Sequence, residues 1–306
     1  VPVPAQTGVS NTSVTMNAAS MENSGFEFSA TYRNRDHALK YDISANVSTL
    51  KNKVTSLGIG KDSYIAGAYA TYVGQEIGKF YGWVYKGIAR TQEDLDNNAV
   101  QQGANVGDCL YEDISGPDGT PDGVIDAYDQ TVLGSGLPKV NFGLSTHLEY
   151  KGFDLNISTY GVLNYHVSDD IYNSLNSCYG YGNKEVGMLD ANRWSEDGST
   201  YLSSVPRTYA ANNATLAWND LFSSRKIQNA AYWKIANVEL GYNFPDKWFG
   251  GYVNGVRLYV SAQNLYTFTS YHGYNVDYAG GTFTPGYNFC SFPSARTFMC
   301  GLHFTF

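Results

Sequence analysis

The sequence predicts an all-β fold, namely a segment of an antiparallel transmembrane β-barrel with long extracellular loops. Three observations lead to this prediction. Several runs of about nine to eleven residues alternate between apolar and polar side chains, as tilted membrane strands do. Short and long connections between these runs alternate regularly along the chain. Finally, only 16% of the 306 residues are charged, whereas Tyr and Phe number 26 and 15.

The first two predicted strands flank a tight turn. In residues 26–33, Phe, Ala and Tyr at the even positions alternate with polar residues. Residues 39–47 alternate in the same way, with the apolar residues at odd positions. Such period-2 alternation is typical of strands with one apolar face. Residues 34–37 lie between the two runs, so we expect a β-hairpin.

Further strands follow in the second half of the chain. Residues 141–150 and 153–158 alternate on either side of Lys151-Gly152, which we expect to form a turn. Residues 232–244 and 256–263 form the next pair. The chain ends in a strand whose apolar side chains are Phe298, Cys300, Leu302, Phe304 and Phe306. We expect this apolar face to contact lipid and the alternate residues to face the lumen.

The connections between predicted strands sort by length. Short links at 34–37, 151–152 and 245–253 alternate with long links at 51–138, 165–231 and 265–294. Bacterial outer-membrane barrels have short periplasmic turns and long outer loops, and this order matches that layout. The link 51–138 has room for a further strand pair, around 64–72 and 79–88, which would leave the alternation unchanged.

About seven strands are too few for a large closed barrel. Backbone groups in hydrocarbon must all be paired, so a sheet with two free edges needs more strands from elsewhere. We therefore expect the chain to be a portion of a longer protein, with the remainder of the barrel as its partner and membrane lipid around it. The start at Val1 without a signal peptide fits a mature or cut product.

Several function classes lack support in the sequence. The net charge is −8 without a Lys/Arg run, which argues against a nucleic-acid partner. The four cysteines show no CxxC spacing, which argues against a zinc site or redox motif. The five histidines are scattered, and no metalloprotease, serine-hydrolase or P-loop pattern occurs. We predict that the chain is not an enzyme.

One acidic segment matches the spacing of a calcium loop. Such loops place oxygen ligands at positions 1, 3, 5, 7, 9 and 12, with Gly at position 6. Gly123 occupies position 6 here, and the ligand positions hold Asp118, Thr120, Asp122, the Val124 carbonyl, Asp126 and Asp129. Two residues depart from the usual pattern. Thr120 replaces an Asp or Asn, and Asp129 replaces the Glu of the last position. The segment is either a structural Ca²⁺ site in an outer loop or a solvated acidic turn.

Two further interpretations stay open. Tyr and Trp clusters, such as Tyr179 with Tyr181, residues 271–278 and Trp83, are suited either to stacking on sugar rings or to packing in loops and at membrane interfaces. The chain as a whole could also be a secreted soluble β-rich domain that binds carbohydrate and carries a calcium loop. The regular loop alternation favours the barrel.

Seven stretches resemble one protein family, the SusC/RagA-like TonB-dependent outer-membrane transporters. They occur in the family's order and run across nearly the whole chain. The stretches are Met21–Glu27 (MENSGFE), Val73–Ile88 (VGQEIGKFYGWVYKGI), Asp122–Asp129 (DGVIDAYD), Gly134–Lys139 (GSGLPK), Tyr150–Leu155 (YKGFDL), Tyr232–Tyr242 (YWKIANVELGY) and the terminal Phe306.

The resemblance implies a location and a function. Residues 1–306 would be the C-terminal portion of a barrel of about 22 strands in the cell outer membrane, with a plugged lumen. The plug and the N-terminal strands, through which TonB acts, would be absent from this chain. The family imports oligosaccharides or peptides together with a SusD-like surface lipoprotein. Leu302, Phe304 and Phe306 would form the terminal signal for barrel assembly.

Overall fold

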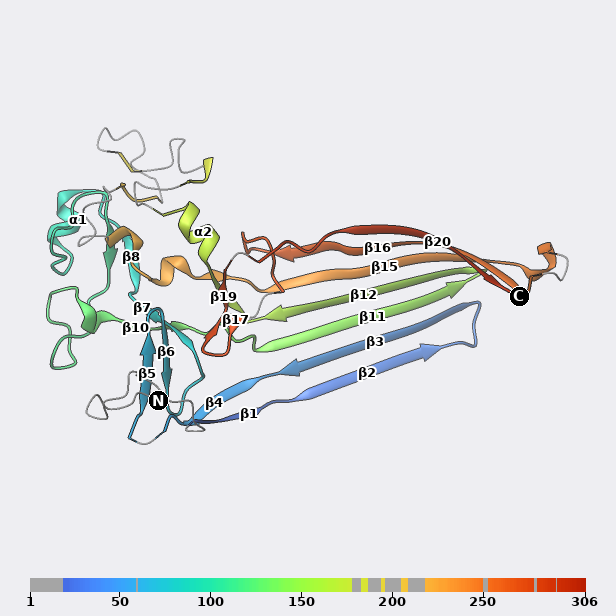
Figure 1. The fold of residues 1–306 in the computed structure, drawn as a ribbon, viewed down its shortest axis with the longest axis horizontal. Helices are drawn as coiled ribbons and strands as arrows, with labels where there is room; N and C mark the ends of the chain where they lie inside the picture. The colour runs from blue at the N-terminus through green and yellow to red at the C-terminus, as the bar shows by residue number, and fades with distance from the viewer. Residues whose placement is uncertain are drawn as a thin grey trace, which may run out of the picture.

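One long sheet dominates the computed structural model, which describes residues 19–58, 60–177, 183–186, 194–195, 205–208, 218–249, 253–277, 280–289 and 291–306 (Figure 1). Seven strands form this sheet in the order β2-β3-β11-β12-β15-β16-β20, and each pairs antiparallel with the next. Their bounds are β2 Glu27–Asn34, β3 Leu39–Thr49, β11 Val140–Tyr150, β12 Phe153–Leu163, β15 Tyr232–Phe244, β16 Gly255–Thr269 and β20 Thr297–Thr305. All seven predicted strands are confirmed.

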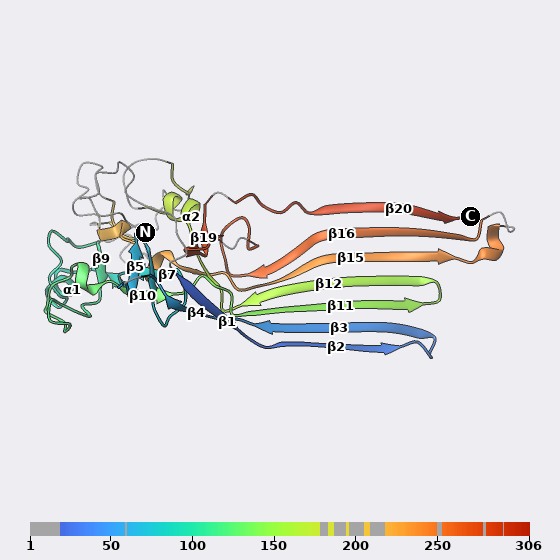
Figure 2. The same ribbon diagram turned by 60° about the horizontal axis from the view of Figure 1, so that its bottom comes forward.

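The connections between these strands lie at two opposite ends of the sheet. The short ones, at 35–38, 151–152 and 245–254, lie at the end that also holds the C-terminus (Figures 1 and 2). The described parts of the long ones, at 50–139, 164–231 and 270–296, lie at the other end. Lys151 and Gly152 both have positive φ, 49° and 88°, as a two-residue hairpin turn requires. The predicted separation of short and long links is confirmed.

The long connections contain short elements of their own. Two strands extend the first hairpin, while a four-stranded sheet, in the order β10-β7-β6-β5, lies beyond it. The two that extend the hairpin are β1 Ser20–Ser24, which precedes β2, and its partner β4 Lys51–Ser56, which opens the first long connection. The other strands of that connection are β5 Ser63–Ala66, β6 Tyr69–Tyr72, β7 Lys79–Gly82, β8 Tyr85–Ile88, β9 Cys109–Tyr111 and β10 Thr131–Gly134. Those of the other two are β13 His166–Asp169, β14 Gln228–Asn229, β17 Gly280–Gly281, β18 Thr284–Pro285 and β19 Tyr287–Asn288.

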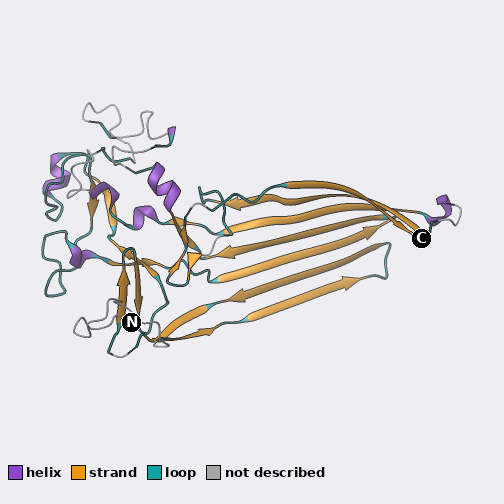
Figure 3. Ribbon diagram, in the orientation of Figure 1, coloured by secondary structure: helices purple, strands orange, loops and turns teal. Residues whose placement is uncertain are grey.

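Helices are few, short and concentrated among these loops (Figure 3). In the described ranges they are α1 Gln92–Asp96, α2 Asp170–Leu175, η2 Ala127–Asp129, η4 Trp218–Asp220, η5 Ser224–Lys226 and η6 Asp246–Phe249; η6 lies in a short connection and the others lie in long ones. Within the described residues, no helix is long and apolar enough to span a membrane.

The expected spanning pair around 64–72 and 79–88 is wrong in its extent. Each half is split into two strands of four residues, β5 with β6 and β7 with β8, and none joins the main sheet. Gly67 turns the chain back with φ 57°, and Gly82 lies so close to Phe222 that a Cβ would stand 2.1 Å from its carbonyl oxygen. Four residues are too few to cross a bilayer.

Candidate functional site

The two faces of the seven-stranded sheet have opposite chemistry. Residues that are paired across strands share a face, so the register shows which side chains lie together. One row across six strands consists of Tyr41, Leu148, Leu155, Leu240, Val260 and Cys300. The row next to it, on the other face, consists of Arg33, Asp42, His147, Asn156, Glu239, Ser261 and Met299. We call these the apolar face and the polar face.

The apolar face has no protein covering in the described part of the chain. Phe28, Leu240, Phe298 and Leu302 lie 66%, 45%, 69% and 54% exposed. A soluble domain rarely leaves so continuous an apolar surface bare. The predicted apolar face of the final strand is confirmed, because its residues pair with apolar residues of β16. The pairs are Phe298–Ala262, Cys300–Val260, Leu302–Leu258 and Phe304–Val256.

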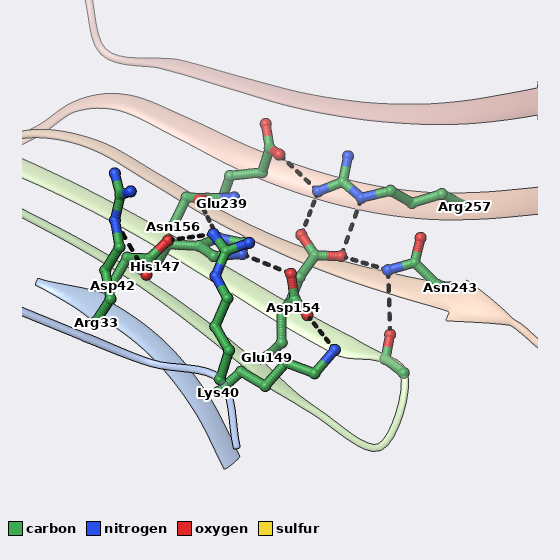
Figure 4. Close-up of polar contacts among 12 residues, drawn as sticks. Arg33, Lys40, Asp42, His147, Glu149, Asp154, Asn156, Glu239, Asn243 and Arg257 are labelled. Carbon is green, nitrogen blue, oxygen red and sulfur yellow. Dashed lines mark hydrogen bonds and ion pairs between the residues drawn. The ribbon is translucent and has the colours of Figure 1, made fainter. Parts of the chain in front are cut away.

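Charged side chains link the strands on the polar face near the short turns (Figure 4). Arg257 on β16 reaches across β15 to the carboxylate of Asp154 on β12, with Nε 3.0 Å from Oδ2. Its Nη2 also donates to Glu239 at 2.7 Å, and Asn243 donates to Asp154 at 2.9 Å. Gly241 makes this reach possible, because a Cβ there would lie 2.5 Å from Asp154 Oδ2 and 2.6 Å from Arg257 Nη2.

A second group continues this charged network toward β3 and β2. His147 contacts Asn156 through Nδ1 at 2.6 Å and Glu149 through Nε2 at 2.9 Å. Lys40 donates to the other oxygen of Glu149 at 3.2 Å. Sequence reasoning from the alternation along residues 141–150 places His147 on the polar face, where it lies, but it does not indicate these partners. It missed the Arg257–Asp154 pair altogether, because no sequence pattern links residues 103 positions apart.

The charged network ties neighbouring strands of the sheet together. Its carboxylates are paired with Arg, Lys or His, and neither a nucleophilic hydroxyl nor a thiol takes part in its hydrogen bonds. The arrangement lacks the nucleophile and base pair that covalent catalysis needs. Four ion pairs between strands fix the polar side chains of six neighbouring strands; the pairs are Arg33–Asp42, Lys40–Glu149, Arg257–Asp154 and Arg257–Glu239.

The acidic segment 118–129 forms a series of carboxylate-capped turns. Asp118 accepts from the amide and hydroxyl of Thr120 at 3.0 and 2.7 Å, and these hydrogen bonds hold the pKa of its carboxyl below the usual range. Asp122 accepts from the Val124 amide at 3.0 Å, and Asp126 from the Tyr128 amide at 2.7 Å.

Asp129, the predicted last ligand, has a different environment from the others. It is fully buried, and its two oxygens accept from the amides of Ile114, Ser115 and Asp126 at 2.8, 3.2 and 2.8 Å. Asp129 therefore fastens the segment to the chain before it. Among the described residues, no group of three His, Cys, Asp or Glu side chains is arranged to hold a metal. The Ca²⁺ site stays a prediction.

The aromatic and cysteine candidates have mainly structural surroundings. Trp83 donates its indole N–H to the Asp126 carbonyl at 2.9 Å, and the Tyr271 hydroxyl is buried against Asp169. Both cases favour loop packing over sugar stacking. Tyr179 and Tyr181 lie outside the described residues. Of the described cysteines, Cys109 is buried and Cys300 lies exposed on the apolar face.

The end of the final strand has little contact with the rest of the chain. Leu302 and Phe304 pair with β16, whereas the strand ends at Thr305. Phe306 is 85% exposed, and its ring stacks on that of Phe304 with the centroids 6.3 Å apart. The predicted assembly signal therefore lies at an accessible edge, beside the short turns.

Comparison with known proteins reveals relatives along the whole chain. TonB-dependent receptor P3 of Formosa agariphila is 30% identical over 100% of the chain, and TonB-dependent receptor SusC of Bacteroides thetaiotaomicron is 25% identical over 97%. The chain spans 30% and 27% of these proteins. The solved RagAB peptide transporter is 22% identical with a TM-score of 0.76, covering 99% of this chain and 31% of that one. No family model matches the chain.

These likenesses confirm the resemblance inferred from the motifs. The receptors establish it over the full length of the chain, and the RagAB likeness shows that the fold is shared. The relatives named here are receptors and transporters rather than enzymes.

Proposed function

Since this chain is related over its full length to TonB-dependent receptors, we propose that it is the C-terminal wall of an outer-membrane barrel that imports oligosaccharides or peptides with energy from TonB. The observation that carries the proposal is the bare apolar face that continues across the seven-stranded sheet. In lipid, that face lowers the free energy of the folded chain, whereas in water it would promote aggregation.

The proposal requires further strands. Within the described residues, β2 and β20 each pair on one side only, so two rows of backbone donors and acceptors are unpaired. In hydrocarbon each unpaired group costs several kcal/mol. The remaining strands of the same transporter would cover these edges, and its plug would lie inside the barrel they close. Refolded alone in detergent, the chain is expected to give no heat-resistant barrel, and a stable closed monomer would contradict the proposal.

A surface lipoprotein of the SusD kind would bind over the long loops. The described parts of all three long connections lie at one end of the sheet. The fold is similar to that of the solved RagAB peptide transporter. Affinity purification of the intact transporter from membranes should recover such a lipoprotein, and its absence under mild detergent would rule out this partner.

Uptake measurements in cells test the import function itself. Cells with the intact transporter should take up a labelled neutral oligosaccharide or hexapeptide from a mixed panel, and deletion of the transporter or of TonB should abolish that uptake. Fractionation should recover the transporter from the outer membrane. A soluble, monodisperse secreted product would instead support the alternative, a carbohydrate-binding β-domain with a calcium loop.

A further inference from the structure

The polar face has a hollow of about 480 Å³ at the end that lies beside the long loops. Gly143 on β11 has no side chain to fill this space, and its register partners are Asn46 on β3 and Tyr160 on β12. Other polar lining residues are Asn141, Ser145 and Ser158. We call this the outer hollow. Its lining offers amide and hydroxyl groups and the aromatic residues Phe142, Tyr160 and Tyr232, and none of the lining residues is charged.

Tyr160 is held in a fixed orientation beside the outer hollow. Its hydroxyl donates to Asp277 Oδ1 at 3.1 Å, and the Lys234 ammonium lies 5.8 Å from its ring centroid. Tyr232 contacts the ring edge-on at 6.1 Å. The residue is nevertheless 36% exposed. A ring that is fixed before binding loses little conformational entropy when a ligand stacks on it.

The charges near Tyr160 neutralise each other. Lys234 is only 4% exposed in its side chain, and its ammonium lies 2.6 Å from Asp277 Oδ2. Asp277 comes from the loop between β16 and β20, and Tyr271 and Asn288 anchor that loop to Asp169. The loop therefore supplies the group that fixes Tyr160, and its charge is not available to a ligand.

We propose that the outer hollow is a subsite for one ring of a neutral oligosaccharide, with Tyr160 as the stacking platform. A pyranose ring has an apolar C–H face that suits an aromatic ring, and its edge of hydroxyls matches neutral donors and acceptors. A charged peptide would find no unpaired opposite charge here. The inference rests on the proposed import function and assigns it a substrate class at one place in the wall.

The test uses the intact transporter purified in detergent. Binding of neutral hexaoses of glucose, mannose, xylose and galactose, and of random-sequence hexapeptides, is measured by isothermal titration calorimetry. We expect at least one hexaose to bind. Tyr160→Ala should weaken its binding about tenfold, the effect of losing a central aromatic contact. Tyr160→Phe keeps the ring, so its affinity should stay within about threefold of the parent value, a difference under 1 kcal/mol.

Two further variants separate stacking from general damage to the strand. Gly143→Leu should fill the outer hollow and abolish binding, whereas Leu163→Ala, on the apolar face of the same strand as Tyr160, should leave the affinity unchanged. Equal affinity of Tyr160→Ala and the parent would overturn the subsite, even if TonB-dependent uptake of that sugar persists and the import function stands. Binding of peptides alone, or of no hexaose, would overturn the assignment to sugars.

Discussion

The sheet and the loop region of this molecule are stabilised in different ways. The seven long strands enclose no core of their own, and many of the large apolar side chains on their apolar face are exposed. The loops, by contrast, bury small conventional cores; one is formed by Cys109, Tyr111 and Ile125, and another by Val162, Tyr165, Val167, Ala230, Tyr232, Tyr271 and Val276. The sheet therefore depends on what surrounds it, whereas the loops depend on contacts within the chain. This difference predicts which substitutions each region tolerates.

The largest expected effect comes from a charge on the apolar face. Leu302→Arg should lower the free energy of unfolding of the intact barrel by about 2–4 kcal/mol, the usual cost of a cation facing the bilayer midplane. Met299 lies on the polar face of the same strand, opposite Ser261. Met299→Arg should therefore lower the free energy of unfolding far less. Urea unfolding in detergent-lipid micelles measures both. Equal losses would contradict the assignment of the apolar face to lipid.

His303→Arg is a less clean control than its position next to Leu302 suggests. His303 lies directly opposite Arg257. A second cation there adds like-charge repulsion of about 0.2–1 kcal/mol between cross-strand neighbours. We still expect a smaller loss than for Leu302→Arg, because strand side chains alternate faces and His303 faces the aqueous side.

The next effect concerns the charged network on the polar face. In a double-mutant cycle, Asp154→Ala and Arg257→Ala should show a coupling of about 0.5–3 kcal/mol, as contacting charged residues do. Asp154 is 7% exposed in its side chain and Arg257 25%, so we expect the upper half of this range. The matched pair Lys40–Glu149, with 52% and 45% exposure, should give only about 0.2–1 kcal/mol. Equal coupling in the two cycles would refute the importance of burial here.

The two regions also differ in how far the sequence predicts them. All seven long strands and both faces follow from period-2 alternation, because each strand has one apolar and one polar face. The strands in the loops contain only two to six residues, which is too short for a periodic signal. In the polar network, the position of His147 could be predicted, but the reach of Arg257 over Gly241 could not, because it depends on register between distant strands. The acidic turns followed from Gly and Asp spacing, whereas the burial of Asp129 did not.

The loop prediction with the sharpest test is the Ca²⁺ site. Asp122→Asn with Asp126→Asn keeps an oxygen acceptor for the amides of Val124 and Tyr128 but removes two negative charges. We expect bound Ca²⁺ to be lost while the turns persist, with global stability changed by no more than about 0.5 kcal/mol. Metal analysis and limited proteolysis of the intact transporter measure these two outcomes.

Asp129→Ala serves as the contrast to that double variant. Its carboxylate holds three backbone amides in a buried site, so its loss should open the loop to protease whether or not Ca²⁺ is present. If the parent protein binds no Ca²⁺ at millimolar concentration, the segment is only an acidic turn. Protection of the Asp129→Ala loop by added Ca²⁺ would show that the ion, rather than this carboxylate, fastens the loop.

The smallest effect on stability is expected at the end of the chain, where the sheet has no lateral support. Phe306 lies beyond the last ladder pair, Gly255 with Thr305, and is 85% exposed. Deleting it removes one ring stack with Phe304 and no backbone hydrogen bond of the sheet, so the unfolding free energy should change by no more than about 0.5 kcal/mol.

We nevertheless expect deletion of Phe306 to leave less protein in the outer membrane, because a terminal aromatic resembles the signal for barrel assembly. Phe306→Tyr keeps an aromatic ring and should restore the membrane level, whereas Phe306→Ser should not. Immunoblots of outer-membrane fractions, combined with unfolding of the inserted protein, separate assembly from stability. A deletion variant with normal membrane levels would show that the terminal ring is dispensable for assembly, and one with a large loss of stability would show that the strand end is held by contacts other than its stack on Phe304.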